Sequence, residues 1–162
     1  MRQGLSQDLI ARVLGAAPKY TLDELEKKFP PRALPDGAFV TRFAPSPTGF
    51  MHLGGLYGAL VDCKLARDTG GVFMLRIEDT DTKREVASAV DIIVDSMHRF
   101  GLEYSDVPEY GPYYQSQRRD IYHSVAADLL ARGLAYPCFL TADDMEQIRT
   151  NQKAAGFATG IY

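Results

Sequence analysis

The stretch FVTRFAPSPTGFMHLGG, Phe39–Gly55, carries the clearest signals of secondary structure in the chain. Its first part, 39–44, is a β-branched and aromatic run that predicts a strand, and the loop 45–49 with its two prolines ends that strand in a stiff turn. After the loop, apolar residues recur at helical spacing over 53–65, and the glycine pair 70–71 supplies a left-handed stop. The stretch therefore predicts a strand, a rigid turn and a helix.

A second strand and further helices follow downstream. The nearly continuous apolar run 72–77 predicts a strand covered by helices on both faces, and it ends in the acidic segment 78–81. Capping residues and apolar spacing predict three more helices: one from Thr82, whose capping box with Glu85 precedes apolar residues up to Phe100; one from Ser116 to Gly133; and one from Thr141. The segment 134–140 predicts a third short strand. Strands that alternate with helices indicate an α/β fold with a parallel sheet, and ligands bind such sheets outside the carboxyl ends of the strands.

Residues 1–36 differ from the rest of the chain and form a predicted helical extension. Short helical patterns cover 6–14 and 21–29, and the second opens with the capping box TLDE. The proline pair 30–31 ends this helix, because proline cannot continue one. A linker through Gly37 leads to the first strand.

Composition excludes several classes of protein. With 162 residues and 46% apolar composition, the chain is long enough for one domain with a core. No apolar run approaches the length needed to cross a bilayer, and the first residues lack the apolar part of a secretion signal, so we expect a cytoplasmic protein. A formal charge of −3 argues against a surface that is wholly a nucleic-acid footprint. Cys63 and Cys138 lie in apolar segments, where we expect buried, reduced thiols and neither a disulfide nor a metal.

A glycine-containing helix start offers a site for phosphate. The chain has neither a P-loop nor a dinucleotide-binding fingerprint. His52-Leu53-Gly54-Gly55 instead falls at the first turn of a helix that follows a strand, where free amides and the helix dipole favour anions. The glycines remove side chains that would keep a nucleotide away, and His52 can donate a hydrogen bond to a phosphate oxygen. Alone, this pattern is weak evidence, because a histidine and two glycines at a helix start usually form a turn with a satisfied polar side chain; the stiff loop in front of it favours a binding site.

Two charged residues lie near the carboxyl ends of the first two predicted strands. Arg42 is a cation within an apolar strand, and Glu78 is the first acid after the second strand. An arginine fork suits a carboxylate and a glutamate suits an ammonium group, so together they match a zwitterionic ligand with an additional acidic side chain. The alternative is that the two residues pair with each other or with Arg76 and Asp79.

Several motifs resemble those of the glutamyl-tRNA synthetases, which are class I aminoacyl-tRNA synthetases. The segment Val40–Gly55 resembles this family's form of the motif named for His-Ile-Gly-His, and RIEDTD at 76–81 is as specific. The segment GPYYQSQR at 111–118 resembles the part that leads toward the family's acceptor-stem-binding insertion. YPCFLT at 136–141 matches the start of that insertion, so the resemblance runs from about Val40 to the end of the chain.

The resemblance implies a fold and a division of the chain. The implied fold is the first half of the Rossmann-like nucleotide-binding parallel sheet of a class I synthetase, preceded by the helical extension 1–36. Residues 37–133 would form this half of the catalytic domain, and 134–162 the beginning of the tRNA acceptor-binding insertion. The family's second ATP loop, of Lys-Met-Ser-Lys-Ser type, its later strands and its anticodon-binding domain are absent from the 162 residues. We therefore expect a truncated part that is inactive alone.

The resemblance also implies an activity. The family uses ATP, with Mg²⁺, to activate L-glutamate as glutamyl-adenylate, and it transfers the glutamyl group to the 3′ end of tRNA(Glu). Whether tRNA(Gln) is a second acceptor stays open, and we expect a monomer. Carried over by position, the implied contacts are Arg42, Ala44, Ser46 and Glu78 for glutamate; His52, as the catalytic residue, with Thr48, Gly54 and Gly55 for ATP; and Arg118 and Arg119 for tRNA.

One departure and two alternatives accompany the resemblance. Where some family members have Cys-x-Cys for zinc, this chain has Cys138-Phe139-Leu140, so we do not expect zinc. One alternative is a paralogue of the glutamyl-queuosine tRNA(Asp) synthetase type, which charges a modified base in tRNA and lacks an anticodon domain; Arg42 and Glu78 would serve it equally. The other is a folded module that binds ATP or glutamate without turnover. The Ser-Pro-Thr-Gly loop together with Glu-Asp-Thr-Asp favours the ordinary synthetase.

Overall fold

The computed structural model describes residues 4–49, 51–81, 83–84 and 86–160. The chain divides into two compact units, one formed by residues 18–128 and the other by 1–17 together with 129–162. All the predicted site residues lie in the unit 18–128, which we call the sheet unit. The domain boundaries at 36 and 133 that the sequence suggested stay predictions.

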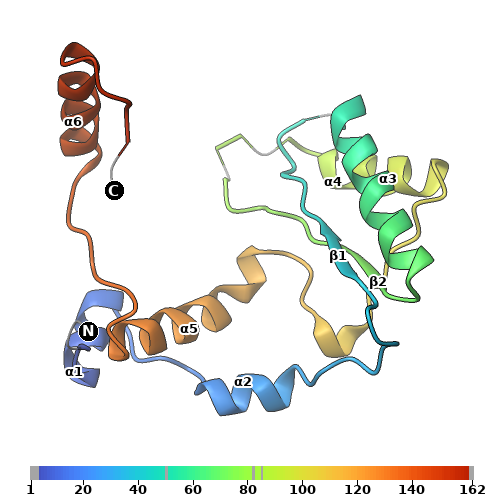
Figure 1. Cartoon of the computed structure of the whole chain (residues 1–162), viewed down its shortest axis with the longest axis horizontal. Helices are drawn as coiled ribbons and strands as arrows, with labels where there is room; N and C mark the ends of the chain where they lie inside the picture. The colour runs from blue at the N-terminus through green and yellow to red at the C-terminus, as the bar shows by residue number, and fades with distance from the viewer. Residues whose placement is uncertain (1–3, 50, 82, 85, 161–162) are drawn as a thin grey trace. The chain divides into compact units, whose positions relative to one another are not determined.

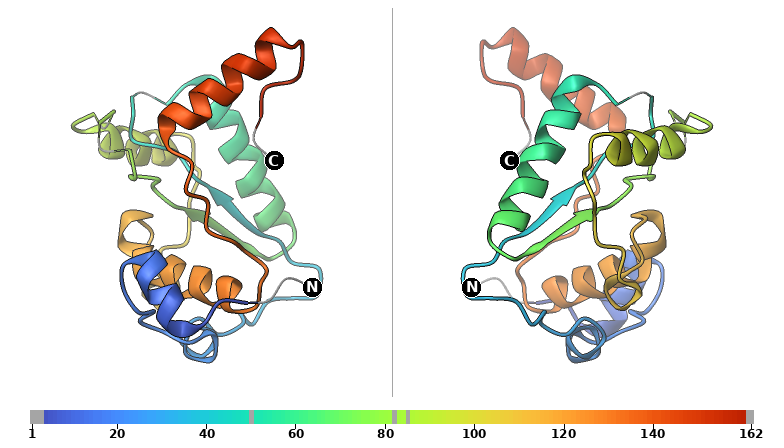
Figure 2. Two further views of the ribbon diagram at one scale, coloured as in Figure 1. Left: turned by 90° about the vertical axis from the view of Figure 1, so that its left-hand side faces the viewer. Right: turned by 90° about the vertical axis from the view of Figure 1, so that its right-hand side faces the viewer.

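Two parallel strands with a helix between them form the centre of the sheet unit. β1 (Val40–Phe43) pairs with β2 (Val72–Leu75), and Arg42 lies opposite Met74. α3 (Leu53–Asp68) connects the strands and runs beside both of them (Figure 1, Figure 2). The predicted order of strand, turn, helix and strand is confirmed.

The connection from α3 to β2 depends on two glycines. Gly70 has φ of +66°, the left-handed conformation that ends a helix at little cost in glycine. A side chain on Gly71 would collide with the carbonyl of Phe39, and the neighbouring amide of Val72 donates to that carbonyl oxygen at 2.9 Å. The pair therefore ends the helix and allows the strands to approach each other.

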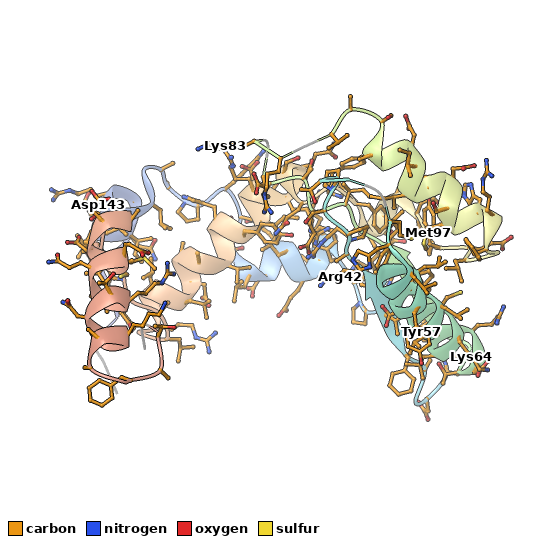
Figure 3. The ribbon with its side chains drawn as sticks, turned by 90° about the horizontal axis from the view of Figure 1, so that it is seen from above. Arg42, Tyr57, Lys64, Lys83, Met97 and Asp143 are labelled. Carbon is orange, nitrogen blue, oxygen red and sulfur yellow. The ribbon has the colours of Figure 1, made fainter. Side chains whose placement is uncertain are left out.

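The core of the sheet unit lies on one face of the two strands. It combines residues of α3, β2 and α4 (Ala89–Arg99) with the segments that follow β2 and α4: Ala59, Cys63, Ala66, Phe73, Leu75, Ile77, Ile93, Met97 and Leu102. Met97 is fully buried and lies between α3 and α4, whereas Tyr57 extends from the outer side of α3 (Figure 3). The apolar spacing that predicted α3 and α4 thus marks real packing faces.

The opposite face of the strands, which carries Arg42, is covered less: Val40 and Arg42 of β1 are exposed. Burial alternates along β2, with Phe73 and Leu75 in the core and Val72 and Met74 only partly covered. Two helical layers would bury both faces, so the prediction that helices cover β2 on both sides is wrong for the described residues. Arg42 lies on this less buried face, opposite Met74.

α4 begins later than the sequence suggested. Thr82 and Glu85, the predicted capping box, lie outside the described residues. The helix starts at Ala89 behind Ser88, whose side chain makes no capping hydrogen bond. Val86, predicted as a helical residue, precedes the helix because its amide donates to the carbonyl of Pro47 at 2.9 Å.

The segment after α4 differs from the prediction at two points. Ser116 is not a helix cap: it opens the 3₁₀ turn η2 (Ser116–Arg118), and α5 (Arg119–Ala131) follows. The segment 134–140 has no strand structure, so the predicted third strand is wrong. A parallel bridge joins Tyr114 to Ile77 instead, next to the end of β2.

The remaining helices agree with their capping signals. α1 (Gln7–Leu14) is capped by Ser6, and α2 (Leu22–Lys28) and α6 (Ala142–Ala154) both begin with the complete capping boxes of Thr21 and Thr141. A short 3₁₀ turn, η1 (Pro108–Tyr110), lies between α4 and α5. Local capping chemistry is therefore a reliable guide to helix starts at both ends of this chain.

Both cysteines are free, but only one is buried as predicted. Cys63 is part of the core, whereas Cys138 is exposed in the segment 134–140 that lacks strand structure. None of the helices in the described ranges combines the length and the apolar character that a membrane span requires.

Candidate active site

The proline loop after β1 is fixed to the acidic segment after β2. The strand ladder continues beyond β2, because the amide of Arg76 donates to the carbonyl of Phe43 and the amide of Glu78 to the carbonyl of Pro45, each at 2.9 Å. Pro47 is fully buried in the middle of the loop. These backbone bonds bring the end of β1 and the end of β2 to one edge, as a parallel sheet requires.

His52 caps the helix that follows the loop. Its Nδ1 accepts a hydrogen bond from the amide of Gly55 at 3.2 Å. A ring nitrogen that accepts carries no proton, so Nε2 is the nitrogen that can donate to a ligand. A Cβ on Gly54 would lie 3.2 Å from His52 Nδ1, which is tighter than most real contacts. The first glycine of the motif thus leaves room for the histidine cap.

A hollow of about 290 Å³ lies between the loop and the start of α3. We call it the loop hollow, and its lining includes Phe43, Ser46, Thr48, His52, Gly55 and Ile93. Three of the four residues predicted to bind ATP lie here together; Gly54 does not line the hollow. Ligand pockets usually measure roughly 300–1,000 Å³, so the loop hollow has room for part of a nucleotide.

Arg42 and Glu78 lie on the same face of the sheet but at different positions along the strands. Side chains alternate along a strand, so Met74, Arg76 and Glu78 share the face that carries Arg42. Glu78 lies four residues beyond Met74, and roughly 13 Å along the strand direction therefore separates it from Arg42. An amino-acid ligand and a long arginine side chain can bridge such a gap.

The pairing alternatives raised by the sequence are only partly realised. Glu78 accepts a hydrogen bond from Arg76, with 2.7 Å between Oε1 and Nη2. Arg42 makes no ion pair among the described residues. Burial raises the pKa of the Asp62 carboxyl on α3, and the positive charge of Arg42 opposes that rise. Arg42 therefore keeps its hydrogen-bond donors available for a ligand.

Asp79 has a structural partner of its own. Its carboxylate accepts hydrogen bonds from the amide of Ser116 at 2.8 Å and from the hydroxyl of Ser116 at 2.6 Å. Burial raises the pKa of the Asp79 carboxyl, but these hydrogen bonds outweigh it and leave the pKa below its ordinary value. Asp79 thus joins the end of β2 to the start of the α5 region.

Comparison with known proteins identifies the family. The family model for tRNA synthetases class I (E and Q), catalytic domain, matches residues 38–159. The chain belongs to this family of class I tRNA synthetases. The match covers β1, the loop hollow and the acidic segment, which carry the predicted site.

Relatives of this synthetase chain are glutamate–tRNA ligases. The chain is 45% identical over 166 residues to the glutamate–tRNA ligase of Clostridium beijerinckii, covering 98% of this chain and 30% of the relative. It is 51% identical over 141 residues to that of Acetivibrio thermocellus, covering 83% and 26%. A glutamate tRNA ligase crystal structure from Elizabethkingia meningosepticum, in complex with its amino acid, matches at 39% identity and a TM-score of 0.61 over 74% of this chain and 24% of that one. The chain thus spans about a third or less of the length of these relatives.

The two arginines predicted to bind tRNA lie in different surroundings within the synthetase chain. Arg118 is half-buried, donates to the carbonyl of Pro112 at 3.0 Å and lies 5.5 Å from the centre of the Phe29 ring. Arg119 is exposed at the start of α5 and lines a separate hollow beside Asp79. Their contact with tRNA stays a prediction, and the two are not one basic patch.

Sequence reasoning missed a second hollow in this synthetase chain. It measures about 310 Å³ and lies on the face of the sheet that carries Arg42; we call it the arginine hollow, and its lining includes Phe29, Arg32, Arg42, Arg76, Tyr110 and Arg118. Strand alternation could have placed Arg76 beside Arg42. Nothing in the local sequence indicates that the linker residue Arg32 returns to the sheet.

Proposed function

We propose that the chain is the N-terminal part of a glutamate–tRNA ligase. The ligase activates L-glutamate with ATP to form glutamyl-adenylate and pyrophosphate, and then transfers the glutamyl group to the 3′ end of tRNA(Glu). The observation that carries this proposal is the placement of Arg42 and Glu78 on one sheet face beside the loop that bears His52. A bound nucleotide and a bound acidic amino acid would then meet at the same edge.

Arg42 and Glu78 select the amino acid in this proposal. Arg42, which has no carboxylate partner in the described chain, binds the side-chain carboxylate of glutamate. Glu78 binds the ammonium group, and Arg76 holds its carboxylate in place at 2.7 Å. Ala44 and Ser46 complete the amino-acid pocket in this proposal; both lie where β1 enters the loop, and Ser46 also lines the loop hollow.

The loop hollow receives ATP. His52 donates from Nε2 to a phosphate oxygen while Nδ1 keeps the helix capped, and Gly54 and Gly55 leave the helix start open. Thr48 lines the same hollow. Mg²⁺ would accompany the phosphates of ATP, as Mg²⁺ commonly binds through substrate phosphates. Catalysis is positioning and charge stabilisation at the reacting atoms.

The tRNA substrate, the cellular compartment and the oligomeric state belong to the same proposal. We infer that tRNA(Glu) is the acceptor, that Arg118 and Arg119 lie on its path, and that the ligase is a cytoplasmic monomer. Charging assays with purified tRNAs test the acceptor: glutamate on tRNA(Glu) is the expected product. Glutamate on tRNA(Asp), with none on tRNA(Glu), would instead identify the paralogue that modifies queuosine, and product on tRNA(Gln) would widen the specificity.

The 162 residues alone are proposed to bind substrates without turnover. No sequence of Lys-Met-Ser-Lys-Ser type is present to stabilise the phosphate charge that develops during adenylate formation. Exchange of pyrophosphate into ATP, with glutamate and tRNA(Glu) supplied, should be absent for residues 1–162 and present for the whole ligase. Robust exchange by residues 1–162 would contradict this.

A further inference from the structure

The arginine hollow carries more positive charge than its described surroundings neutralise. Four arginines line it: Arg32, Arg42, Arg76 and Arg118. One carboxylate, that of Glu78, pairs with one of them. Bringing like charges into one hollow costs free energy, which a bound anion would recover.

The four arginines differ in what their guanidinium groups already bind. Arg76 donates to Glu78, and Arg118 donates to the carbonyl of Pro112. Arg32 and Arg42 have no oxygen acceptor among the described residues. Two forks are therefore available for a ligand, one from β1 and one from the linker after α2.

Arg32 is held next to Arg42 by contacts that leave its charge unpaired. Its guanidinium lies 3.5 Å from the centre of the Tyr110 ring, and Nη2 lies 3.4 Å from the sulfur of Met74. Met74 is the strand neighbour of Arg42. Stacking on a ring fixes an arginine without neutralising it, so the fork is oriented before a ligand arrives.

We propose that Arg32 is a specificity-determining residue, which joins Arg42 in binding the side-chain carboxylate of the amino acid. This inference rests on the proposed function, in which Arg42 binds that carboxylate. Arg32 precedes residues 38–159, so the family match assigns it no role. A carboxylate offers about four acceptor positions, enough for two forks.

The second fork bears on the choice between glutamate and glutamine. The two side chains are nearly equal in shape, but the amide has no charge and brings its own NH₂ donors toward the arginines. Two arginines left without a carboxylate in a partly buried hollow make glutamine costly to bind. Arg32 thus increases the preference for glutamate over glutamine beyond what Arg42 alone would provide.

The test uses the whole ligase, three single variants and Arg42→Ala as a reference. Arg32→Met keeps an apolar stem over Tyr110 and removes the fork, Arg32→Lys restores a charge without the fork, and Lys27→Ala is a control at an exposed position on α2. Pyrophosphate exchange is measured with glutamate or glutamine in the presence of tRNA(Glu). Thermal unfolding of each variant shows whether the extension still folds.

We expect Arg32→Met to raise the KM for glutamate roughly 10- to 100-fold, with the KM for ATP unchanged and the preference for glutamate over glutamine reduced. Arg32→Lys should recover part of the preference. The proposal is overturned if Arg32→Met matches Lys27→Ala, or if it raises both KM values equally, as a loss of packing would. Arg42→Ala serves as the reference: if it too leaves glutamate binding intact, the proposed function fails as well.

Discussion

The loop hollow and the arginine hollow are lined by neighbouring residues of β1, Phe43 and Arg42, and they are built differently. The loop hollow is lined mostly by one continuous stretch, 43–55, with Pro45, Gly49 and Gly55 in it and His52 as its titratable side chain. The arginine hollow consists mostly of long charged and aromatic side chains from the segment after α2, from β1, from β2 and its continuation, and from the turns before α5. The first suits phosphates at a helix start, and the second suits a carboxylate. Each hollow should therefore control the affinity for a different substrate.

Arg42→Ala should distinguish the two hollows most clearly, by changing the kinetics for glutamate and not those for ATP. Loss of the fork leaves a partly buried carboxylate unpaired, which costs roughly 3 kcal/mol, or more than 100-fold in kcat/KM for glutamate. The KM for ATP should stay within about twofold, since Arg42 does not line the loop hollow. Steady-state pyrophosphate exchange by the whole ligase measures both values. Equal losses for glutamate and ATP would mean that the two hollows are one site.

Gly54→Ala should have a smaller effect, and on the KM for ATP instead of the KM for glutamate. The new methyl group would crowd His52 Nδ1, displace the ring from its cap and raise the KM for ATP about tenfold, while glutamate is unaffected. Gly58→Ala is the matched control, because a Cβ there meets open space in the same helix. That control should keep activity and stabilise the protein by roughly 0.5–1 kcal/mol. If Gly54→Ala behaves like the control, the glycine is not needed for the cap.

Capping and ligand binding by His52 can be separated next. His52→Ala removes the hydrogen bond to the amide of Gly55 and should lower the free energy of unfolding by about 1 kcal/mol. His52→Asn keeps a capping oxygen and should restore stability without restoring the KM for ATP. Urea unfolding and exchange kinetics on the same preparations check both. Recovery of ATP affinity by asparagine would show that His52 acts only as a cap.

The smallest effect is expected at Asp79, which joins the end of β2 to the start of the α5 region, and it concerns how the free energy of unfolding depends on pH. The pKa of Asp79 is lowered in the folded protein, so its contribution to stability is present above its ordinary pKa of 3.8 and is lost as pH falls through the lowered value. Asp79→Asn should therefore destabilise the protein at about pH 7 and have less effect at about pH 3. Urea unfolding at the two pH values measures the difference. A constant difference would exclude the carboxylate charge as the cause.

Local signals in the sequence predict the strand, loop and helix around the loop hollow well, and they predict the arginine hollow poorly. Capping boxes, the proline loop and the glycine pair act over a few residues, and they identify α1, α2, α3, α6 and both strands. The start of α4 is missed because the amide of Val86 bonds to Pro47, far away in the chain. The false strand at 134–140 has the right composition, but a strand also needs a partner.

The arginine hollow is missed for a similar reason. Arg42 and Arg76 follow from strand alternation, yet Arg32 reaches them only because the linker after α2 folds back toward Tyr110. No periodicity records such a return. Tertiary contacts of this kind become visible only in the structure.

In the proposed function this chain supplies the glutamate pocket of a ligase that activates its amino acid with ATP. The decisive measurement is pyrophosphate exchange by the whole ligase, with tRNA(Glu) present and either glutamate or glutamine as the substrate. We expect robust exchange with glutamate and little with glutamine, because the two arginine forks require a carboxylate. Exchange that is absent with glutamate, or equal for the two amino acids, would contradict it.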